Sequence, residues 1–474
     1  MNSTTHQEAK GFYKLSWLQR IGFGSGDFAQ NLIYQTVMQY ISIFYTTVVG
    51  LNPLIVGVMF VIPPIINIFG SLALGAFIDK SNPKWGKYRS YLIYGGVPLT
   101  AFAILCFWNG FPGGTTVTYA FVTYVGLSLF YTVVNVPYGA LMASLTRDTD
   151  EITKLASTRM FLANLGGLAV GFGIPQIVGF LSPNGKFNTP DAATAWFITM
   201  SIYALVGLVL LVFCFSQSKE RVVMKSETTS EVKASDLWME FLRNRPLRVL
   251  ALFILTAFAL MGISNAAGAY YISYNLNVAD AAQTTSWFQG LGSIPAFIFL
   301  PLVPAIKRAI GKKQMFYVFL SIAIFGMALL YFVSVIPALR SQIWIVMVAQ
   351  FIKSTGIVVA TGYMWALTPE VISYGEYTTG RRIAGIVSAI IGVAFQFGMA
   401  IGGFVPNAVL RFVGFNKDLD IQTPLAQEGI LWLVAVLPVI LLFVAMFIIS
   451  KYELEDDVID KINKEIEAGH LKND

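Results

Sequence analysis

Long apolar runs constrain this chain more than any other feature. Each run holds about 20 or more predominantly apolar residues, which is enough for an α-helix to cross the hydrocarbon core of a bilayer. Inside a bilayer the backbone must satisfy its own hydrogen bonds, and a continuous apolar run of this length does so as a helix. We expect twelve such spans, near residues 20 to 48, 54 to 78, 90 to 109, 115 to 145, 155 to 181, 194 to 215, 247 to 276, 283 to 306, 315 to 337, 341 to 368, 383 to 411 and 430 to 450.

The composition supports an all-α membrane protein. Of 474 residues, 56% are hydrophobic and only 12% are charged, which is too little charge to cover a water-soluble surface. The polar stretch before the first span has no apolar core or cleavage site, so we expect no signal peptide. Cys106 and Cys214 are too few for a disulfide framework. His6 and His470 lie in the tails, so we expect no histidine metal site in the membrane, and no cofactor.

The basic residues predict the orientation. Most of the 32 Lys and Arg residues lie in the tails and in loops on one side of the predicted membrane. The positive-inside rule then places both termini in the cytoplasm of a multi-pass cell-membrane protein. The net charge of +6 could indicate nucleic acid, but the charges sit in short loops, so the bilayer is the expected partner. Four basic residues fall on the opposite side: Lys186, Arg340, Arg411 and Lys417.

The long connection at 216–246 divides the predicted spans into six and six. The loop after the second span of each half is basic, at 79–89 and again at 307–313. Two parallel repeats of six helices are the plan of the major facilitator fold, with a substrate site at mid-membrane. We therefore expect bundles at 1–215 and 247–450, a cytoplasmic linker at 216–246 and a cytoplasmic tail at 451–474. Apolar residues at helical spacing predict two surface helices, at Leu237, Trp238, Phe241 and Leu242 and at Leu454, Val458, Ile459, Ile462 and Ile466.

Asp27 is the acid that lies well inside an apolar span, and such a carboxylate indicates a functional site. Spacings of three and four place it on one helical face with four further residues. A row of carboxylate, amides and phenol suits a polyhydroxylated solute. Alternatively, residues 24 to 26 form a turn and Asp27 caps the helix that follows. The other members of the face are Gln30, Asn31, Tyr34 and Met38.

Two cations within spans need partners. Arg159 could pair with Asp27, or it could extend its side chain toward the cytoplasm from the end of its helix. Lys353 lies deeper, where an unpaired ammonium is costly, so we expect a partner such as Asp27 or a shifted pKa. Glu370 lies too far along the same predicted span to be that partner.

Further polar faces lie on the second and fourth spans. Asn67, Ser71, Gly75 and Asp79 share one face, where small polar residues can equally be packing contacts between helices. Asp79 lies at the cytoplasmic end, where we expect a gating contact with nearby lysines. The fourth span carries Ser128, Tyr131, Asn135 and Tyr138, a face that could oppose that of the first span. The second half could add stacking or hydrogen bonds from Trp365, Tyr270, Tyr271, Tyr274 and Asn265, although such aromatic residues also serve packing.

Several motifs occur in the order found in one transporter family. The stretch from Gly75 to Arg89, with Asp79, Lys80, Trp85, Gly86 and Lys87, resembles the glycoside-pentoside-hexuronide:cation symporter family, the melibiose-permease-like branch of the major facilitator superfamily. The overall pattern looks most similar to the type that carries xylosides such as isoprimeverose. The other marks are Gly26-Asp27-Phe28, Phe44-Tyr45-Thr46, Val49-Gly50-Leu51, Asn135-Val136-Pro137-Tyr138 and Tyr374-Gly375-Glu376-Tyr377 with Gly380 and Arg382.

The resemblance is uneven from residue to residue. It implies that Asp27 binds sugar hydroxyls and that Arg159 is needed for transport, while Asn135 replaces a sugar-binding aspartate. Asn67 and Ser71 stand where the family has paired aspartates for sodium or proton. Gln396 likewise replaces a lysine, so the sugar residues are partly retained and the known cation residues are missing.

These observations predict a secondary active transporter that imports a glycoside or a pentose-containing disaccharide by alternating access. Proton symport is favoured over sodium symport, because neutral oxygens at Asn67 and Ser71 compensate poorly for dehydration of a hard cation. An uncoupled facilitator or exchanger remains an alternative, as does a lipid carrier in which Asp27 and Lys353 bind a zwitterion. An enzyme is not expected, because the spans contain no histidine, acid pair or glycine-rich phosphate loop.

Overall fold

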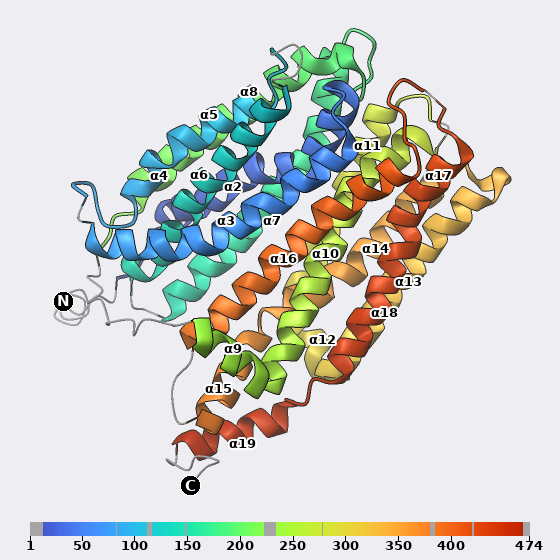
Figure 1. The fold of residues 1–474 in the computed structure, drawn as a ribbon. Coiled ribbons are helices and arrows are strands. Elements are labelled where there is room, and N and C mark those ends of the chain that lie inside the picture. The colour runs from blue at the N-terminus through green and yellow to red at the C-terminus, as the bar shows by residue number, and fades with distance from the viewer. Residues whose placement is uncertain are drawn as a thin grey trace. The chain divides into compact units, whose positions relative to one another are not determined.

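The computed structural model describes residues 13–81, 83–110, 116–146, 149–221, 234–276, 278–379, 384–419 and 421–467, and their regular structure is entirely helical (Figure 1). The chain divides into two compact units. One comprises Met1–Glu227 with Ala279–Gly290, and the other comprises Thr228–Val278 with Leu291–Asp474. Each unit is described by itself.

The first described helix of the first unit is α2, which carries the polar face of Asp27. Ser16 caps α2 by accepting from the backbone of Gln19, whose side chain binds back to Ser16 in a capping box. Within the unit α2 packs against α7 and α8, and α6 packs against α3 and α5. The helices are α2 (Trp17–Ile43), the π-helical η1 (Phe44–Val48), α3 (Pro53–Lys80), α4 (Ser90–Tyr94), α5 (Gly96–Cys106), α6 (Thr116–Leu145), α7 (Thr149–Leu181), η2 (Pro190–Ala192) and α8 (Ala193–Gln217).

The second unit packs α10 against α16 and α13 against α14. Asn244 caps α10, with Pro246 in its first turn. The helix α11 begins in the first unit and continues into the second. The elements are α9 (Ala234–Arg243), α10 (Arg245–Tyr274), α11 (Ala281–Phe299), η3 (Leu300–Leu302), α12 (Val303–Ile310), α13 (Lys312–Val335), η4 (Pro337–Leu339), α14 (Ile343–Met364), α15 (Leu367–Thr379), α16 (Ala384–Phe412), α17 (Pro424–Leu431), η5 (Trp432–Val436), α18 (Leu437–Ser450) and α19 (Asp456–Glu467).

The predicted all-α membrane fold is confirmed. Within the described residues, 9 helical segments are long and apolar enough to cross a membrane, and Pro53–Ile68 and Ser90–Cys106 are shorter apolar helices. The polar-faced α2 completes the twelve helices expected of the major facilitator fold. Its polar face lowers its mean hydropathy, and α2 is therefore not among the 9 apolar segments.

Three predicted spans are interrupted near one end. The span predicted at 90 to 109 is divided into α4 and α5 at Gly95. The span predicted at 283 to 306 breaks into α11, η3 and α12, because Pro301 and Pro304 remove backbone donors and restart the helix. The span predicted at 341 to 368 ends as α14 at Met364, and a separate helix α15 follows. The two predicted surface helices correspond to α9 and α19.

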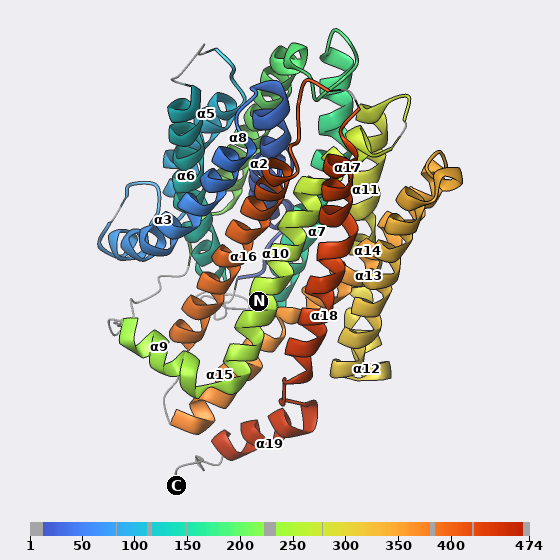
Figure 2. The ribbon, with the colours of Figure 1, turned by 45° about the vertical axis from the view of Figure 1, so that its right-hand side comes forward.

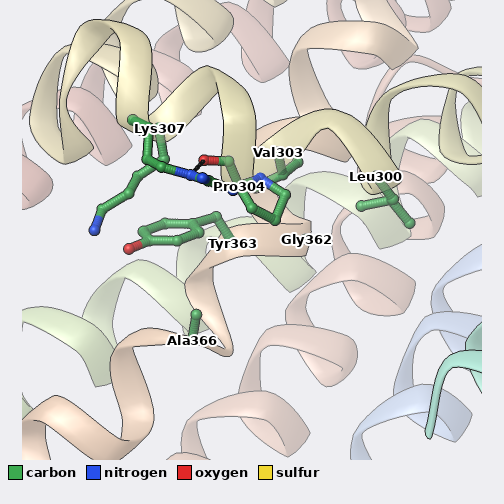
Figure 3. A pocket seen from close by; sticks show the side chains of 8 residues that line it. Leu300, Val303, Pro304, Lys307, Gly362, Tyr363 and Ala366 are labelled. Carbon is green, nitrogen blue, oxygen red and sulfur yellow. Dashed lines mark hydrogen bonds between the residues drawn. The ribbon is translucent and has the colours of Figure 1, made fainter. Parts of the chain in front are cut away.

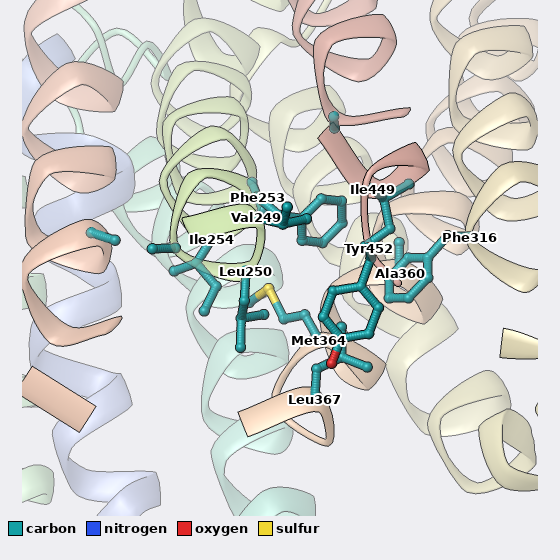
Figure 4. Close-up of a cluster of buried hydrophobic side chains, with 14 of the residues drawn as sticks. Val249, Leu250, Phe253, Ile254, Phe316, Ala360, Met364, Leu367, Ile449 and Tyr452 are labelled. Atoms are coloured by element: carbon teal, nitrogen blue, oxygen red, sulfur yellow. The ribbon is translucent and has the colours of Figure 1, made fainter. Parts of the chain in front are cut away.

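The apolar core of the second unit extends to the segment after the last span. Figure 4 shows Val249, Phe253, Ile449 and Tyr452 side by side with residues of α13 and α14. Leu454 and, on α19, Ile462 are also buried, and α19 packs against α15. The helix α19 is therefore a folded part of the second unit.

A buried lysine joins the same elements. The Lys312 side chain is only 2% exposed, and its Nζ donates to both carboxylate oxygens of Glu370 at 2.8 Å. It also donates to the backbone carbonyl of Leu454 at 2.8 Å and lies 3.1 Å from a carboxylate oxygen of Asp456. Asp456 pairs in addition with Lys307. These contacts replace the water that a buried ammonium loses.

Candidate functional site

Asp27 lies in the middle of α2. Residues 24 to 26 are helical, and the cap of α2 is Ser16. The alternative in which residues 24 to 26 form a turn and Asp27 caps a helix is therefore wrong. The Asp27 side chain lies inside the helical bundle and is 16% exposed.

Asp27 forms an ion pair with Arg159 of α7. Arg159 Nε donates to one carboxylate oxygen at 2.6 Å, and its terminal nitrogen donates to the other at 3.3 Å. The Arg159 side chain is 22% exposed, so the pair is accessible from one side. Of the two alternatives for Arg159, the structure shows pairing with Asp27. A bidentate guanidinium–carboxylate pair is strong and directional, and its remaining donors and lone pairs can bind a polar ligand.

Two aromatic rings hold the guanidinium. The Arg159 carbon Cζ lies 4.6 Å from the ring centre of Tyr138 and 5.6 Å from that of Phe23. The two rings are stacked 4.9 Å apart, and the Tyr138 hydroxyl donates to the backbone carbonyl of Phe23 at 2.7 Å. Cation–π contacts of this kind fix the orientation of Arg159 toward Asp27.

Glycines in α2 permit this approach of helices. A Cβ atom on Gly26 would lie 2.6 Å from the Tyr138 ring and 3.0 Å from the Cys214 sulfur, and one on Gly24 would lie 2.8 Å from Leu162. Such distances are shorter than van der Waals contact. The glycines therefore let α6, α7 and α8 come close enough to α2 for the ion pair to form.

The polar faces of α2 and α6 meet next to the ion pair. Tyr34 and Tyr131 stack with ring centres 4.0 Å apart and planes inclined by 14°. Asn31 donates from Nδ2 to the backbone carbonyl of Asp27 at 2.9 Å, which leaves its side-chain oxygen on the same face. Asn135, one turn of α6 beyond Tyr131, is exposed. The arrangement places a carboxylate, a guanidinium, an amide and two phenols along one face.

A buried network of neutral polar groups joins α3 to α6. Asn67 donates from Nδ2 to the Ser128 hydroxyl at 2.8 Å, and its carbonyl oxygen accepts from Thr132 at 3.1 Å. Asn67 is thus engaged through both ends of its amide. The side chains of Ser71 and Asp79, predicted to act in coupling and gating, lie outside the described residues.

The remaining predicted residues belong to the second unit. Lys353 is buried in α14, 4% exposed, where the backbone passes close to Gly326 of α13. Glu370 of α15 binds Lys312. Trp365 is exposed at the end of α14 and contacts Phe258 edge-on, and Gln396 is half-buried in α16. Whether these residues act together with Asp27 stays a prediction.

Aromatic residues proposed as ligand contacts from α10 are used in packing. Tyr271 is buried and shares a hydrogen bond of 2.6 Å with Ser334. Tyr270 and Tyr274 both contact the ring of Phe415 edge-on. These contacts favour the packing interpretation.

Sequence reasoning missed two residues that shape the site. Phe23 lies one turn before Asp27 on α2, and Thr132 lies one turn after Ser128 on α6. Phe23 could have been found as the residue one helical turn before Asp27, and Thr132 as the residue one turn after Ser128. Among the described residues, no group of three or more His, Cys, Asp or Glu is placed to hold a metal ion.

The family model described as MFS/sugar transport protein matches residues 22–456. The chain belongs to this family. An uncharacterized symporter, YnaJ, from Bacillus subtilis (strain 168) is 40% identical over 455 residues, covering 96% of this chain and 95% of the relative. A glucuronide carrier protein homolog from Escherichia coli (strain K12) is 30% identical and covers 96% of both chains. The predicted resemblance to glycoside:cation symporters is confirmed.

Two further similarities bear on the fold and on substrates. The isoprimeverose transporter of Lactiplantibacillus pentosus is 30% identical over 403 residues, with 84% of this chain and 81% of that protein covered. Among solved structures, the nucleoside transporter NupG superposes with a TM-score of 0.65 at 14% identity, covering 91% of this chain and 98% of that one. At this identity the similarity of NupG supports the fold alone. The relatives are transporters, which is consistent with a protein that is not an enzyme.

Proposed function

We propose that this protein imports a glycoside or a pentose-containing disaccharide, such as isoprimeverose, by alternating access with proton symport. The observation that carries the proposal is the partly exposed Asp27–Arg159 ion pair within membrane-spanning helices. Charged residues at that depth are costly and mark substrate or ion pathways. The names of the relatives, a glucuronide carrier homolog and an isoprimeverose transporter, support a glycoside as the substrate.

The polar face can recognise a sugar by complementary chemistry. The Asp27 carboxylate accepts hydrogen bonds from adjacent hydroxyls, and the Arg159 guanidinium donates to hydroxyl or ring oxygens. The stacked pair of Tyr34 and Tyr131 offers a flat apolar ring surface beside those groups. A pyranose presents the same combination, because its hydroxyls lie around an apolar face of C–H groups.

The network at Asn67 argues against sodium at the position where the family has paired aspartates. Both ends of the Asn67 amide are bound by Ser128 and Thr132, and the lone pair that remains on its carbonyl oxygen carries no formal charge. A hard cation needs several oxygen ligands with negative charge nearby. Asn67 acts instead as a neutral clamp between α3 and α6.

Proton coupling can operate through the ion pair. A proton on Asp27 cancels the carboxylate charge and weakens its attraction for Arg159, so the two helices that carry them can separate. Deprotonation restores the pair. The protonated acid still has a carbonyl oxygen that accepts from a sugar hydroxyl and gains an O–H that donates to one, so sugar and proton can occupy the site together while the helices move. Uncoupled facilitation or exchange is the alternative if Asp27 stays ionised throughout the cycle.

Uptake into inverted and right-side-out vesicles tests the substrate and the coupling. Radiolabelled isoprimeverose, a galactoside and a glucuronide are offered under imposed pH or sodium gradients. We expect xyloside uptake that a protonophore abolishes and that a sodium gradient does not stimulate. Indifference to the protonophore would support the uncoupled alternative, and strong sodium stimulation would refute the interpretation of Asn67.

A charge-neutral variant tests the site. Asp27→Asn removes charge-assisted hydrogen bonds worth about 1.5 to 3 kcal/mol each, so sugar affinity should fall at least tenfold. Asp418→Asn is the matched control, because Asp418 is 72% exposed and forms a surface ion pair with its neighbour Lys417. Unchanged affinity in Asp27→Asn would refute the site.

A lipid carrier is the second candidate function. Asp27 and Lys353 are the two charges that it would use, but Asp27 already binds Arg159, which favours the sugar. Competition of sugar uptake by unlabelled zwitterionic lipid separates the two functions. We further propose that both termini are cytoplasmic and that residues 216–246 link the bundles at 1–215 and 247–450, with residues 451–474 as a tail.

A further inference from the structure

A groove lies beside α12 in the second unit, away from the Asp27 site. Its volume is about 510 Å³, and it runs between α12 and the end of α14. Most of its lining is apolar, from Leu300, Val303, Pro304, Gly362 and Ala366. Tyr363, Lys307 and Arg308 complete it. Figure 3 shows Lys307 and Tyr363 at one end of the groove and Leu300 at the other, so the groove has a polar end and an apolar end.

The groove lies between two segments that are long and apolar enough to cross a membrane. Its two walls come from the membrane-spanning segments Ala281–Ile310 and Ile343–Thr378. After the prolines of η3 the chain turns, and α12 runs crosswise to α13 (Figure 2). The last turn of α12 carries Lys307 and Arg308. A short helix with an apolar side and terminal cations in this position lies at the level of lipid headgroups.

The basic end can receive a phosphate. Arg308 is exposed, and one of its five donors binds the carbonyl of Pro304 at 3.3 Å. Lys307 pairs with Asp456, but an ammonium has three donors, so one such contact does not saturate it. Two cations at one end of an apolar groove match a lipid with net negative charge better than a zwitterionic one.

We propose that this groove binds an anionic phospholipid. The acyl chain lies along Leu300, Val303 and Ala366, and the phosphate lies between Lys307 and Arg308. The apolar walls exclude a free anion as the complete ligand, because inorganic phosphate would use only the basic end. The bound lipid fills space between α12 and α14 and links these two elements.

Native mass spectrometry of the purified full-length protein tests this site with three probes. They are dioctanoyl phosphatidylglycerol, dioctanoyl phosphatidylcholine and inorganic phosphate. We expect phosphatidylglycerol to bind at least about fivefold more tightly than phosphatidylcholine, since each basic residue near an anionic lipid contributes about that factor. Equal affinity for the two lipids, or an affinity for inorganic phosphate equal to that for phosphatidylglycerol, would overturn the proposal.

Two variants separate the ends of the groove. Arg308→Gln should weaken phosphatidylglycerol binding about fivefold and weaken phosphatidylcholine binding less, because the choline cation already offsets the charge of that lipid's phosphate. Ala366→Phe should fill the groove and weaken both lipids. Lys451→Gln, an exposed lysine of the same unit outside the groove, should leave both affinities as they are. If Ala366→Phe does not fold, Arg308→Gln alone tests the proposal, because an exposed arginine can be replaced without leaving a cavity. Full retention of phosphatidylglycerol affinity in Arg308→Gln contradicts the site.

Discussion

Replacement of Lys312 by Met should strongly destabilise the second unit. The lysine is 2% exposed and its partner Glu370 is 14% exposed, so removal of the ammonium leaves a largely buried carboxylate. Loss of one partner of a buried pair costs about 3 to 5 kcal/mol. Glu370 keeps a hydrogen bond of 2.9 Å from the Tyr452 hydroxyl, which places the expected loss at the lower end, about 3 kcal/mol. Glu370→Gln should cost less, about 2 kcal/mol, because Lys312 keeps the Leu454 carbonyl and Asp456.

Equilibrium unfolding in mixed micelles, followed by tryptophan fluorescence, measures these changes. The double variant Lys312→Met with Glu370→Gln should be more stable than the sum of the single losses predicts, with a coupling free energy of about 1 to 3 kcal/mol. Lys417→Met is the matched control, because Lys417 pairs with Asp418 at the surface and such pairs contribute about 0 to 1 kcal/mol. If Lys312→Met and Lys417→Met have equal unfolding free energies, the reasoning from burial is refuted.

Three further variants test other contacts. Gly26→Ala should lower stability by about 1 to 3 kcal/mol and reduce uptake, because its Cβ would lie 2.6 Å from Tyr138. Gly139→Ala is the control, because the space around Gly139 is open, and it should change neither stability nor uptake. Equal stability of the two variants would contradict this reasoning. Burial raises the pKa of Asp456, but hydrogen bonds from its lysine partners outweigh burial and hold the pKa below its usual 3.8; its contribution to docking of α19 is therefore present above pH 3.8 and lost as the pH falls below it. Protection of the α19 amides from hydrogen exchange, relative to the intrinsic rate at each pH, should fall in that range, and Asp456→Asn should show low protection already at pH 6. Glu220 accepts from three successive backbone amides before α4 at 2.8 to 3.0 Å, so Glu220→Ala should increase proteolysis of that loop, and unchanged cleavage would contradict the anchor.

The helices were predictable because their causes are local. Apolar length set the spans, and caps such as Ser16 and Asn244 set their beginnings. The breaks at η3 and after Met364 were not predicted, because an apolar run continues through them. Proline at 301 and 304 was the available signal for the first break. For the second break the signal was Thr368-Pro369, because proline is favoured in the first turn of a helix and disfavours a helical conformation in the residue before it.

The candidate site was predictable as a set of residues and less so as a set of contacts. Asp27 and Arg159 stand out because charge inside an apolar run is costly. Their pairing depends on how closely α2 and α7 approach each other. The two residues are 132 positions apart, so the sequence does not show this distance. The glycines of α2 indicate that some helix approaches closely, but they do not say which one. The partners of Lys312, by contrast, come from α15 and from the segment after α18. No pattern in the sequence near Lys312 indicates them.

The contact between Lys312 and the Leu454 carbonyl also has a consequence for biosynthesis. The two residues are 142 positions apart, and a ribosome needs roughly 7 to 28 s to cover that distance. Once Val335 has been added α13 is complete, but for the rest of that interval its lysine lacks the Leu454 carbonyl and the Asp456 carboxylate that will surround it. A chain released early would also leave uncovered the surface that Ile462 occupies. We therefore expect that quality-control proteases distinguish finished from unfinished copies of this protein at that end of the second unit.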